Sequence, residues 1–295
     1  MIEKLCNAFG PSGWEDEVRE IIKANIEPYA DKVWVDKMGN LYAYKDGSKK
    51  GKSLVVSAHM DEVGFMVSHI GDEGTVCFDT LGGIDPSVVS GKRIVIGNKR
   101  IPAVISSKAI HMQTPEERKQ ILPIDKMHID VGASTKEEAE SLVNVGDVAV
   151  FAPNYEIIGD GYIKSKAIDD RLGCGALIEV LKKGVEYPTY FAFVTREEIG
   201  CRGASAAAYM LQTDLAVIAE CTTASDIYGT PPHEKVCCLD SGPAVSFMDR
   251  ATVYDVELFR NVCHIADSKE LKYQIKNVVA GGNDSSAYQR SATGT

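Results

Sequence analysis

The fold of this chain is decided by residues 171–219, which read RLGCGALIEVLKKGVEYPTYFAFVTREEIGCRGASAAAYMLQTDLAVIA. Two runs with helical character, 171–183 and 203–211, alternate here with two short apolar runs, 189–194 and 215–219. Such alternation is typical of parallel α/β sheets, because each crossover helix covers one face of the sheet. We therefore expect an α/β fold in which helices flank the sheet.

The first 57 residues add one helix and three strands to this lobe. Ser12 and Glu15 have the spacing of a capping box, and apolar residues between Val18 and Ile26 then recur every three or four positions. This pattern predicts an amphipathic helix that begins after Ser12. Three β-rich runs follow, at residues 33–35, 41–44 and 54–56, with a turn at Gly39-Asn40 between the first two.

The segment between the two parts of this lobe has a different character. From about Ile70 to about Asp160, short strands are broken by glycines, and helical periodicity occurs only near 136–142. This pattern predicts a small β domain inserted into the α/β lobe. We expect residues 1–68 and 161–295 to form a discontinuous catalytic domain and residues 69–160 to form the insertion, with a β-barrel-like fold.

Composition excludes several function classes. The 295 residues are 44% hydrophobic and 25% charged, with a net charge of -10, which argues against binding to nucleic acid or to an anionic membrane surface. The first ten residues, MIEKLCNAFG, contain no hydrophobic signal core, and no apolar run is long enough to span a bilayer. Eight scattered cysteines without CxxC pairs predict reduced thiols in a cytoplasmic protein, so metal ligands should be carboxylates and histidines.

Polar side chains fall at the ends of the predicted strands. They are His59 with Asp61, Glu197 with Glu198, Glu220, and, before a predicted helix, Asp169 with Asp170. Singly, each is more often a surface charge or a helix cap. Because the carboxyl ends of parallel strands meet at one rim, we expect the group to converge there. A cation would then relieve the repulsion among the carboxylates.

The chemistry that fits this group is hydrolysis assisted by two divalent metal ions. One carboxylate would bridge the ions, and an unligated glutamate would remove a proton from water. Adjacent glutamates suit this division of labour, since consecutive residues in extended backbone point in different directions. Asp61, two residues after His59, is placed to orient the imidazole through its other nitrogen. Zinc or cobalt suits a mixed nitrogen and oxygen ligand set.

Four motifs in this chain resemble, in order, those of the tetrahedral aminopeptidases, a family also called glutamyl aminopeptidases, deblocking aminopeptidases or cellulase M-like proteins. The motifs are AHMDEVG at 58–64, AIDDR at 167–171, REEIGCRGA at 196–204 and GGND at 281–284. Residues 8–13 and 114–118 look like that family as well. The resemblance implies a zinc-peptidase-like mixed sheet and a metalloaminopeptidase with two divalent ions per subunit that acts on peptides.

The resemblance also implies roles for individual residues. His59 would bind the first ion, Asp169 would bridge both ions, Glu198 would bind the second ion, and Glu197 would be the general base. Glu220 stands where the family usually has an aspartate ligand. By the same resemblance, the inserted β domain mediates assembly and substrate access, and dimers assemble into a homo-oligomeric dodecamer.

One family feature is not present in this sequence. Family members continue past the Gly-Gly-x-Asp motif to a histidine that binds the second ion, whereas here no histidine follows His264 before Thr295. We expect weaker binding of the second ion, or a water in place of this ligand. His69, His111, His128, His233 and His264 are expected to have surface or packing roles. Two alternatives stay open: a catalytically impaired metal-binding relative, and a glycan hydrolase, against which the metal-type ligand set argues.

Overall fold

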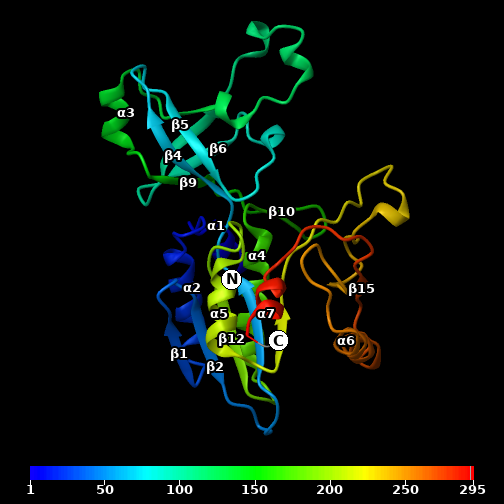
Figure 1. Ribbon diagram of the computed structural model, residues 1–295. Coiled ribbons are helices and arrows are strands. Elements are labelled where there is room, and N and C mark those ends of the chain that lie inside the picture. The colour runs from blue at the N-terminus through cyan, green and yellow to red at the C-terminus, as the bar shows by residue number, and fades with distance from the viewer. Residues whose placement is uncertain (293) are drawn as a thin grey trace.

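A five-stranded mixed sheet forms the centre of the larger lobe in the computed structural model, which describes residues 1–292 and 294–295 (Figure 1). The strand order is β1-β2-β12-β3-β13, in which β12, β3 and β13 are mutually parallel while β1 and β2 run antiparallel to their neighbours. The strands are β1 (Lys32–Val35), β2 (Leu41–Lys45), β3 (Leu54–His59), β12 (Thr189–Val194) and β13 (Leu215–Ile218). The predicted α/β class with a mixed sheet is confirmed.

Strand β12 shows why the sequence folds in this way. Its residues TYFAFV are apolar almost throughout, as expected for a strand that is buried on both faces. Because successive side chains point to opposite faces, Phe191 and Phe193 enter one core, and Ala192 and Val194 enter the other. The sheet therefore needs a helical layer on each side.

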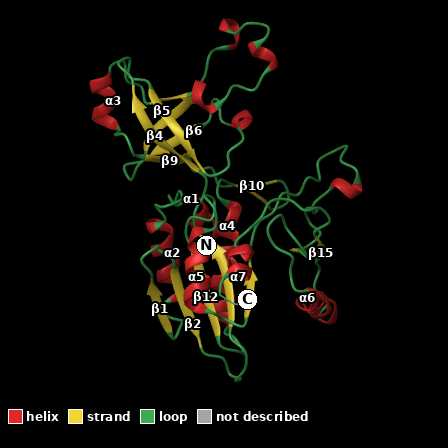
Figure 2. Cartoon of the chain, viewed as in Figure 1, coloured by secondary structure: helices red, strands yellow, loops and turns green. Residues whose placement is uncertain are grey.

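Helices supply these two layers (Figure 2). The core that contains Phe191 is built with apolar residues of α1 (Ile2–Asn7), α2 (Asp16–Ile26) and α4 (Ile168–Lys183). The opposite core is built with alanines of α5 (Arg202–Leu211) and with Tyr288 of α7 (Ser285–Arg290). A Cβ atom added at Gly203 would lie 2.2 Å from the Thr195 carbonyl oxygen, so only glycine permits this close approach of α5 to the end of β12.

A closed barrel follows directly after β3. Six strands form it in the order β4-β5-β8-β7-β6-β9, and pairing of β9 with β4 closes it around its own hydrophobic core. Closure leaves the barrel without a free strand edge. The elements are β4 (Gly64–Ile70), β5 (Val76–Leu81), β6 (Arg93–Ile96), β7 (Ile101–Ser106), β8 (His128–Asp130), β9 (Val148–Phe151) and α3 (Lys136–Leu142).

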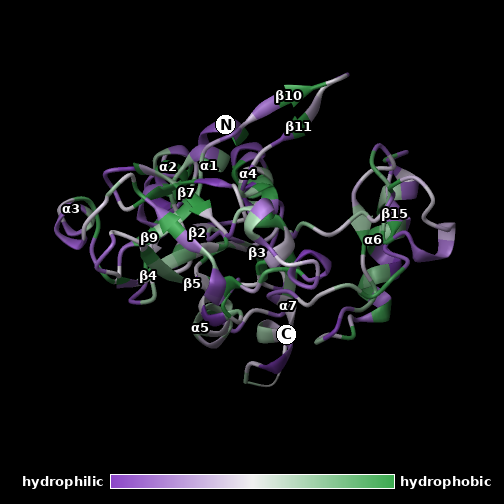
Figure 3. Ribbon diagram, turned by 90° about the horizontal axis from the view of Figure 1, so that it is seen from above, coloured by the Kyte–Doolittle hydropathy of each residue, from purple (hydrophilic) through white to green (hydrophobic). Residues whose placement is uncertain are grey.

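The remaining elements lie outside both cores. Strands β10 (Glu156–Ile158) and β11 (Tyr162–Lys164) pair as a hairpin that extends away from the rest of the chain (Figure 3). Strands β14 (Ala244–Val245) and β15 (Gln274–Ile275) pair beside helix α6 (Val256–Ser268), in a segment that lies to one side of the sheet. Among the described residues, no helix has the length and apolar character needed to cross a membrane.

Two sequence predictions need comment. The prediction of a capping box at Ser12 is wrong, because α2 begins at Asp16 and has Glu15 as its N-cap. The Ser12 hydroxyl instead donates a hydrogen bond to Asp61 Oδ2 at 2.5 Å. Ser12 therefore binds a buried carboxylate that is distant in sequence, and does not cap the helix. The division into 1–68 with 161–295 and 69–160 stays a prediction; the barrel strands themselves run from Gly64 to Phe151.

A buried ion cluster fastens the N-terminal loop to the end of β3 and to α4. The Lys166 ammonium donates to both oxygens of Glu62, at 2.7 and 2.8 Å, and to the Ala8 carbonyl. The fully buried Arg171 guanidinium lies 3.3 Å from Glu62 and donates to the Leu5 and Gly10 carbonyls. One carboxylate thus balances two buried cations.

We expect Glu62→Gln to lower the free energy of unfolding by roughly 3 kcal/mol, because it preserves the shape of the side chain but leaves two buried cations without their counter-charge. Burial already lowers the pKa of Lys166, so the ammonium can relieve part of this cost by losing its proton. Urea denaturation measures the effect. Lys49→Ala, which removes an exposed ion pair with Glu186, is the control and should change nothing measurable. Equal stabilities for Glu62→Gln and the unmodified chain would contradict the cluster's role.

Candidate functional site

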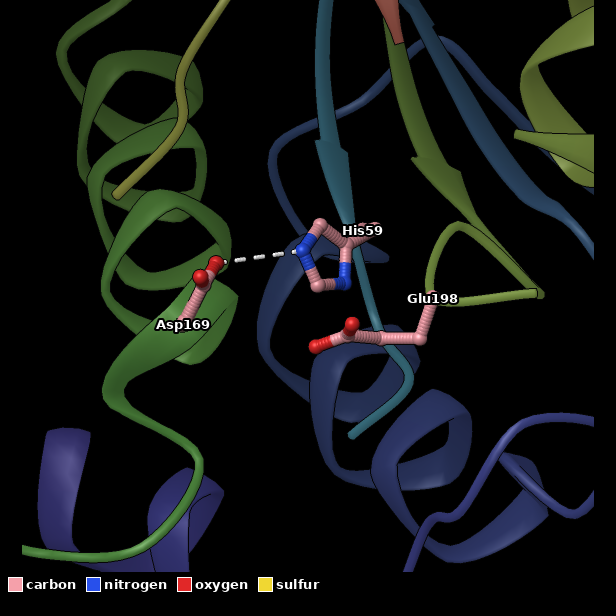
Figure 4. Close-up of side chains that lie close together, drawn as sticks. All are labelled: His59, Asp169 and Glu198. Atoms are coloured by element: carbon pink, nitrogen blue, oxygen red, sulfur yellow. Dashed lines mark hydrogen bonds and ion pairs between the residues drawn. The ribbon is translucent and has the colours of Figure 1, made fainter. Parts of the chain in front are cut away.

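The residues singled out in the sequence converge at the carboxyl ends of the parallel strands. His59 is the last residue of β3 and is 1% exposed; Glu197 and Glu198 lie in the loop after β12, and Glu220 follows β13. Asp169 reaches the same rim from the start of α4, across from Glu198 (Figure 4). Three strands and one helix therefore bring one imidazole and four carboxylates together, as predicted.

His59 Nε2 lies at the centre of the group. It is 3.2 Å from Asp169 Oδ1, 3.4 Å from Glu220 Oε1 and 4.0 Å from Glu197 Oε2. On the other side of the ring, Nδ1 lies 3.1 Å from the Asp61 backbone oxygen and 3.5 Å from its carboxylate. Asp61 thus contacts the nitrogen that the sequence suggested, chiefly through its backbone. With Nδ1 protonated, Nε2 is free to bind a metal ion.

Two sets of donor atoms in this group have spacings compatible with metal binding. His59, Asp169 and Glu198 form one set, and His59, Asp170 and Glu220 form the other. Within each set, the donor atoms lie within 4.8 Å of one another. In the described part of the chain, His59 is the one histidine that enters such a set. All four predicted ligands are therefore within reach of a shared ion or pair of ions.

Two buried carboxylates fix the loop that carries the adjacent glutamates. Asp61 Oδ1 accepts the Glu197 amide at 2.9 Å, and Oδ2 accepts the Glu198 amide at 3.1 Å. Glu15 Oε1 accepts the Arg196 amide at 3.1 Å. Three consecutive N–H groups are thus held by carboxylates. This arrangement positions the Glu197 and Glu198 side chains relative to His59.

The site contains more carboxylates than the single imidazole of His59 can balance in charge. Burial raises the pKa of Glu198 to about 8 and that of Glu220 to about 7, and neighbouring Asp169 adds to both shifts. Burial alone would lower the pKa of His59, but Asp169, Asp61 and Glu220 raise it well above its usual value. Glu220 Oε2 is buried and has no hydrogen-bond partner within residues 1–292 and 294–295. The donor set and this free oxygen fit a divalent ion, which would stabilise the ionised carboxylates.

Several contacts near the site were not predicted from the sequence, although Asp170 had been named beside Asp169 in the polar group. Asp170 Oδ2 accepts the His59 amide at 3.2 Å, and the Cys174 thiol lies 3.1 Å from the His59 carbonyl oxygen. Glu15 had been interpreted as part of a capping box. Asp284 is fully buried close to Glu197 and Cys201. Only the quoted motif at 281–284 could have directed attention to Asp284, and the motif gave it no role.

Comparison with known proteins places this geometry in context. Residues 39–295 match the family model of the M42 glutamyl aminopeptidases. The chain is 28% identical over 284 residues to a lysyl aminopeptidase of Pyrococcus furiosus, covering 93% of this chain and 78% of that protein. A TET aminopeptidase structure from a thaumarchaeote of marine sediment superposes with a TM-score of 0.95, at 36% identity, over 99% of this chain and 84% of that one. The TET1 peptidase of Pyrococcus horikoshii, described as assembling into a tetrahedron or a large octahedral shell, gives 0.85 at 32% identity, over 98% and 87%.

The buried carboxyl group of Glu15 should make the free energy of unfolding depend on pH. Burial raises its pKa from 4.5 to about 7, so its contribution to stability is fully present below pH 4.5 and is lost as the pH rises through about 7. Glu15→Gln retains an acceptor oxygen for the amides but does not titrate. Relative to the unmodified chain, the variant should gain up to roughly 3 kcal/mol of unfolding free energy between about pH 4 and about pH 8.

Urea denaturation of the metal-depleted protein across this pH range measures the difference between the two proteins. Glu27→Gln, at the exposed end of the same helix, is the control and should follow the unmodified chain. A Glu15→Gln curve that stays parallel to that of the unmodified chain would show that Glu15 titrates normally.

Proposed function

This chain belongs to the M42 glutamyl aminopeptidase family of metal-dependent peptide-bond hydrolases, and we propose that it removes N-terminal residues from peptides at the His59 site. We propose two divalent ions, zinc or cobalt, bound by His59, Asp169, Glu198 and Glu220. The observation that carries this proposal is the convergence of one buried imidazole from β3 with carboxylates from three other elements. Carboxylates that only solvate the surface would stay apart, because their negative charges repel one another.

The chain's own residues suggest how the reaction is organised. When bound, the ions would act as Lewis acids that polarise a peptide carbonyl and increase the acidity of water. Asp61 holds the Glu197 and Glu198 amides, so the loop presents its two carboxylates without further rearrangement. Burial raises the pKa of Glu197, which favours proton uptake. Glu197 would take a proton from the attacking water and return it to the leaving amine.

Assembly and substrate class are further parts of the proposal. Since the similar TET1 peptidase can assemble into a tetrahedron or a large octahedral shell, we propose that this chain forms homo-oligomers and that its barrel contributes to the contacts between subunits. Peptides are the proposed substrates. The names of its relatives include both glutamyl and lysyl aminopeptidases, so the preferred N-terminal residue has to be found by measurement.

Glycan hydrolysis is favoured by the names of two similar solved structures, one of them an endoglucanase of Thermotoga maritima with a TM-score of 0.80 at 35% identity. The site argues against it, since the carboxylates surround an imidazole that is suited to binding a metal. The alternative that the site supports is a metal-binding relative without turnover, because His59 is the one described histidine in the donor sets. Turnover of aminoacyl p-nitroanilides after addition of zinc or cobalt, together with metal content by mass spectrometry, separates the two. Firm metal binding with no turnover of any aminoacyl residue would reject the aminopeptidase.

Glu197→Gln tests the proposed division of labour between the two glutamates. Loss of the general base should lower turnover by roughly 100- to 10,000-fold, with the bound metal retained. Glu198→Gln is the matched variant and should lower the metal content itself, because it removes a charged ligand. Mass spectrometry of the dialysed proteins gives the metal content. Full turnover by Glu197→Gln would mean that another group accepts the proton.

A further inference from the structure

Asp284 is a buried carboxylate without a partner. It lies at the start of α7, is 0% exposed, and neither of its side-chain oxygens has a hydrogen-bond partner among the described residues. Leaving a buried polar group unpaired is costly, and an ionised carboxylate is the most costly case. Such a group therefore requires a proton or a cation beside it.

Two other donors face Asp284. Glu197, from the loop after β12, and Cys201, at the start of α5, place one donor atom each so that the three atoms lie within 4.8 Å of one another. The Cys201 Sγ lies 3.5 Å from Glu197 Oε1. The Cys201 and Gly200 amides both donate to the Glu197 carbonyl oxygen, at 2.9 and 2.8 Å, so a tight turn fixes the thiol and the carboxylate relative to each other.

The donor chemistry is that of a thiophilic cation. A thiolate with two carboxylates suits zinc or cadmium better than magnesium or calcium, which prefer oxygen ligands alone. Burial raises the pKa of Cys201, and the neighbouring Asp284 and Glu197 raise it further. A cation bound here would reverse this repulsion and release the thiol proton to solvent.

We propose that Glu197, Cys201 and Asp284 form a separate binding site for a zinc-like cation, distinct from the ligand sets around His59. None of these three residues belongs to either His59 set. A cation here would engage the Glu197 carboxylate, which then could not accept a proton from water. Occupancy of this site therefore inhibits hydrolysis. The inhibitory effect rests on the proposed function, whereas the binding of the cation does not.

Cadmium titration of the metal-depleted full chain tests binding. A cadmium thiolate absorbs in the ultraviolet, so the unmodified chain should show this band at low cadmium concentration. Cys201→Ser should lose the tight component of the band, and Asp284→Asn should weaken it at least tenfold. Cys263→Ser, which alters a thiol in α6, is the matched control and should retain it. An unchanged band in Cys201→Ser would overturn the site, as would unchanged cadmium affinity in Asp284→Asn.

A second measurement tests inhibition. Turnover at a large excess of zinc, divided by turnover at stoichiometric zinc, should be at least tenfold lower in the unmodified chain than in Cys201→Ser. This ratio is internal to each protein, so a change in basal rate does not affect it. A cadmium band with no inhibition by excess zinc would overturn the inhibitory role. A chain without turnover would reject the proposed function, while the cadmium titration would still decide whether the cation site exists.

Discussion

Mutual repulsion among carboxylates is the constraint on which the rest of this structure depends. Asp169, Glu197, Glu198 and Glu220 meet at one partly buried rim, and only one imidazole lies among them. Such a group separates unless covalent geometry, hydrogen bonds and cations hold it in place. The parallel strands fix the backbones, and the interior carboxylates Asp61 and Glu15 fix the loop amides. Hydrogen bonds and strand pairing in the protein itself thus set the positions of the proposed ligands in the loop after β12.

One short stretch connects the site to the protein core. Within residues 59–62, His59 supplies the imidazole, Asp61 holds the loop after β12, and Glu62 balances Lys166 and Arg171. The Glu62 backbone also pairs with the N-terminal loop, since its amide donates to the Gly10 carbonyl and its carbonyl accepts the Ser12 amide. A displacement of this stretch would move the site and its supports together. Chemistry and stability are therefore difficult to separate by mutation here.

The sequence was most informative where structure is periodic and local. The alternation in 171–219 predicted the helices and parallel strands because each crossover helix must cover a sheet face, and the strand ends then located the rim. Ser12 shows the limit of this reasoning: a local cap was expected, but a hydrogen bond to distant Asp61 is formed instead. Asp284 and Glu15 were missed as neighbours of the loop because only the tertiary structure brings them there. Roles within the site follow from the resemblance and stay predictions.

The insertion of the barrel between β3 and β12 has a consequence for folding. Val56 of β3 pairs with Phe191 of β12, so the central parallel pair cannot form until the whole barrel segment has been synthesised. Barrel strands contact one another within a single continuous stretch, so the barrel can fold as a unit, and the pairing of β4 with β9 brings its two ends together. Closure of the barrel would then shorten the chain loop that separates β3 from β12. The folded barrel would in this way keep β3 and β12 close together while the sheet that carries the site forms.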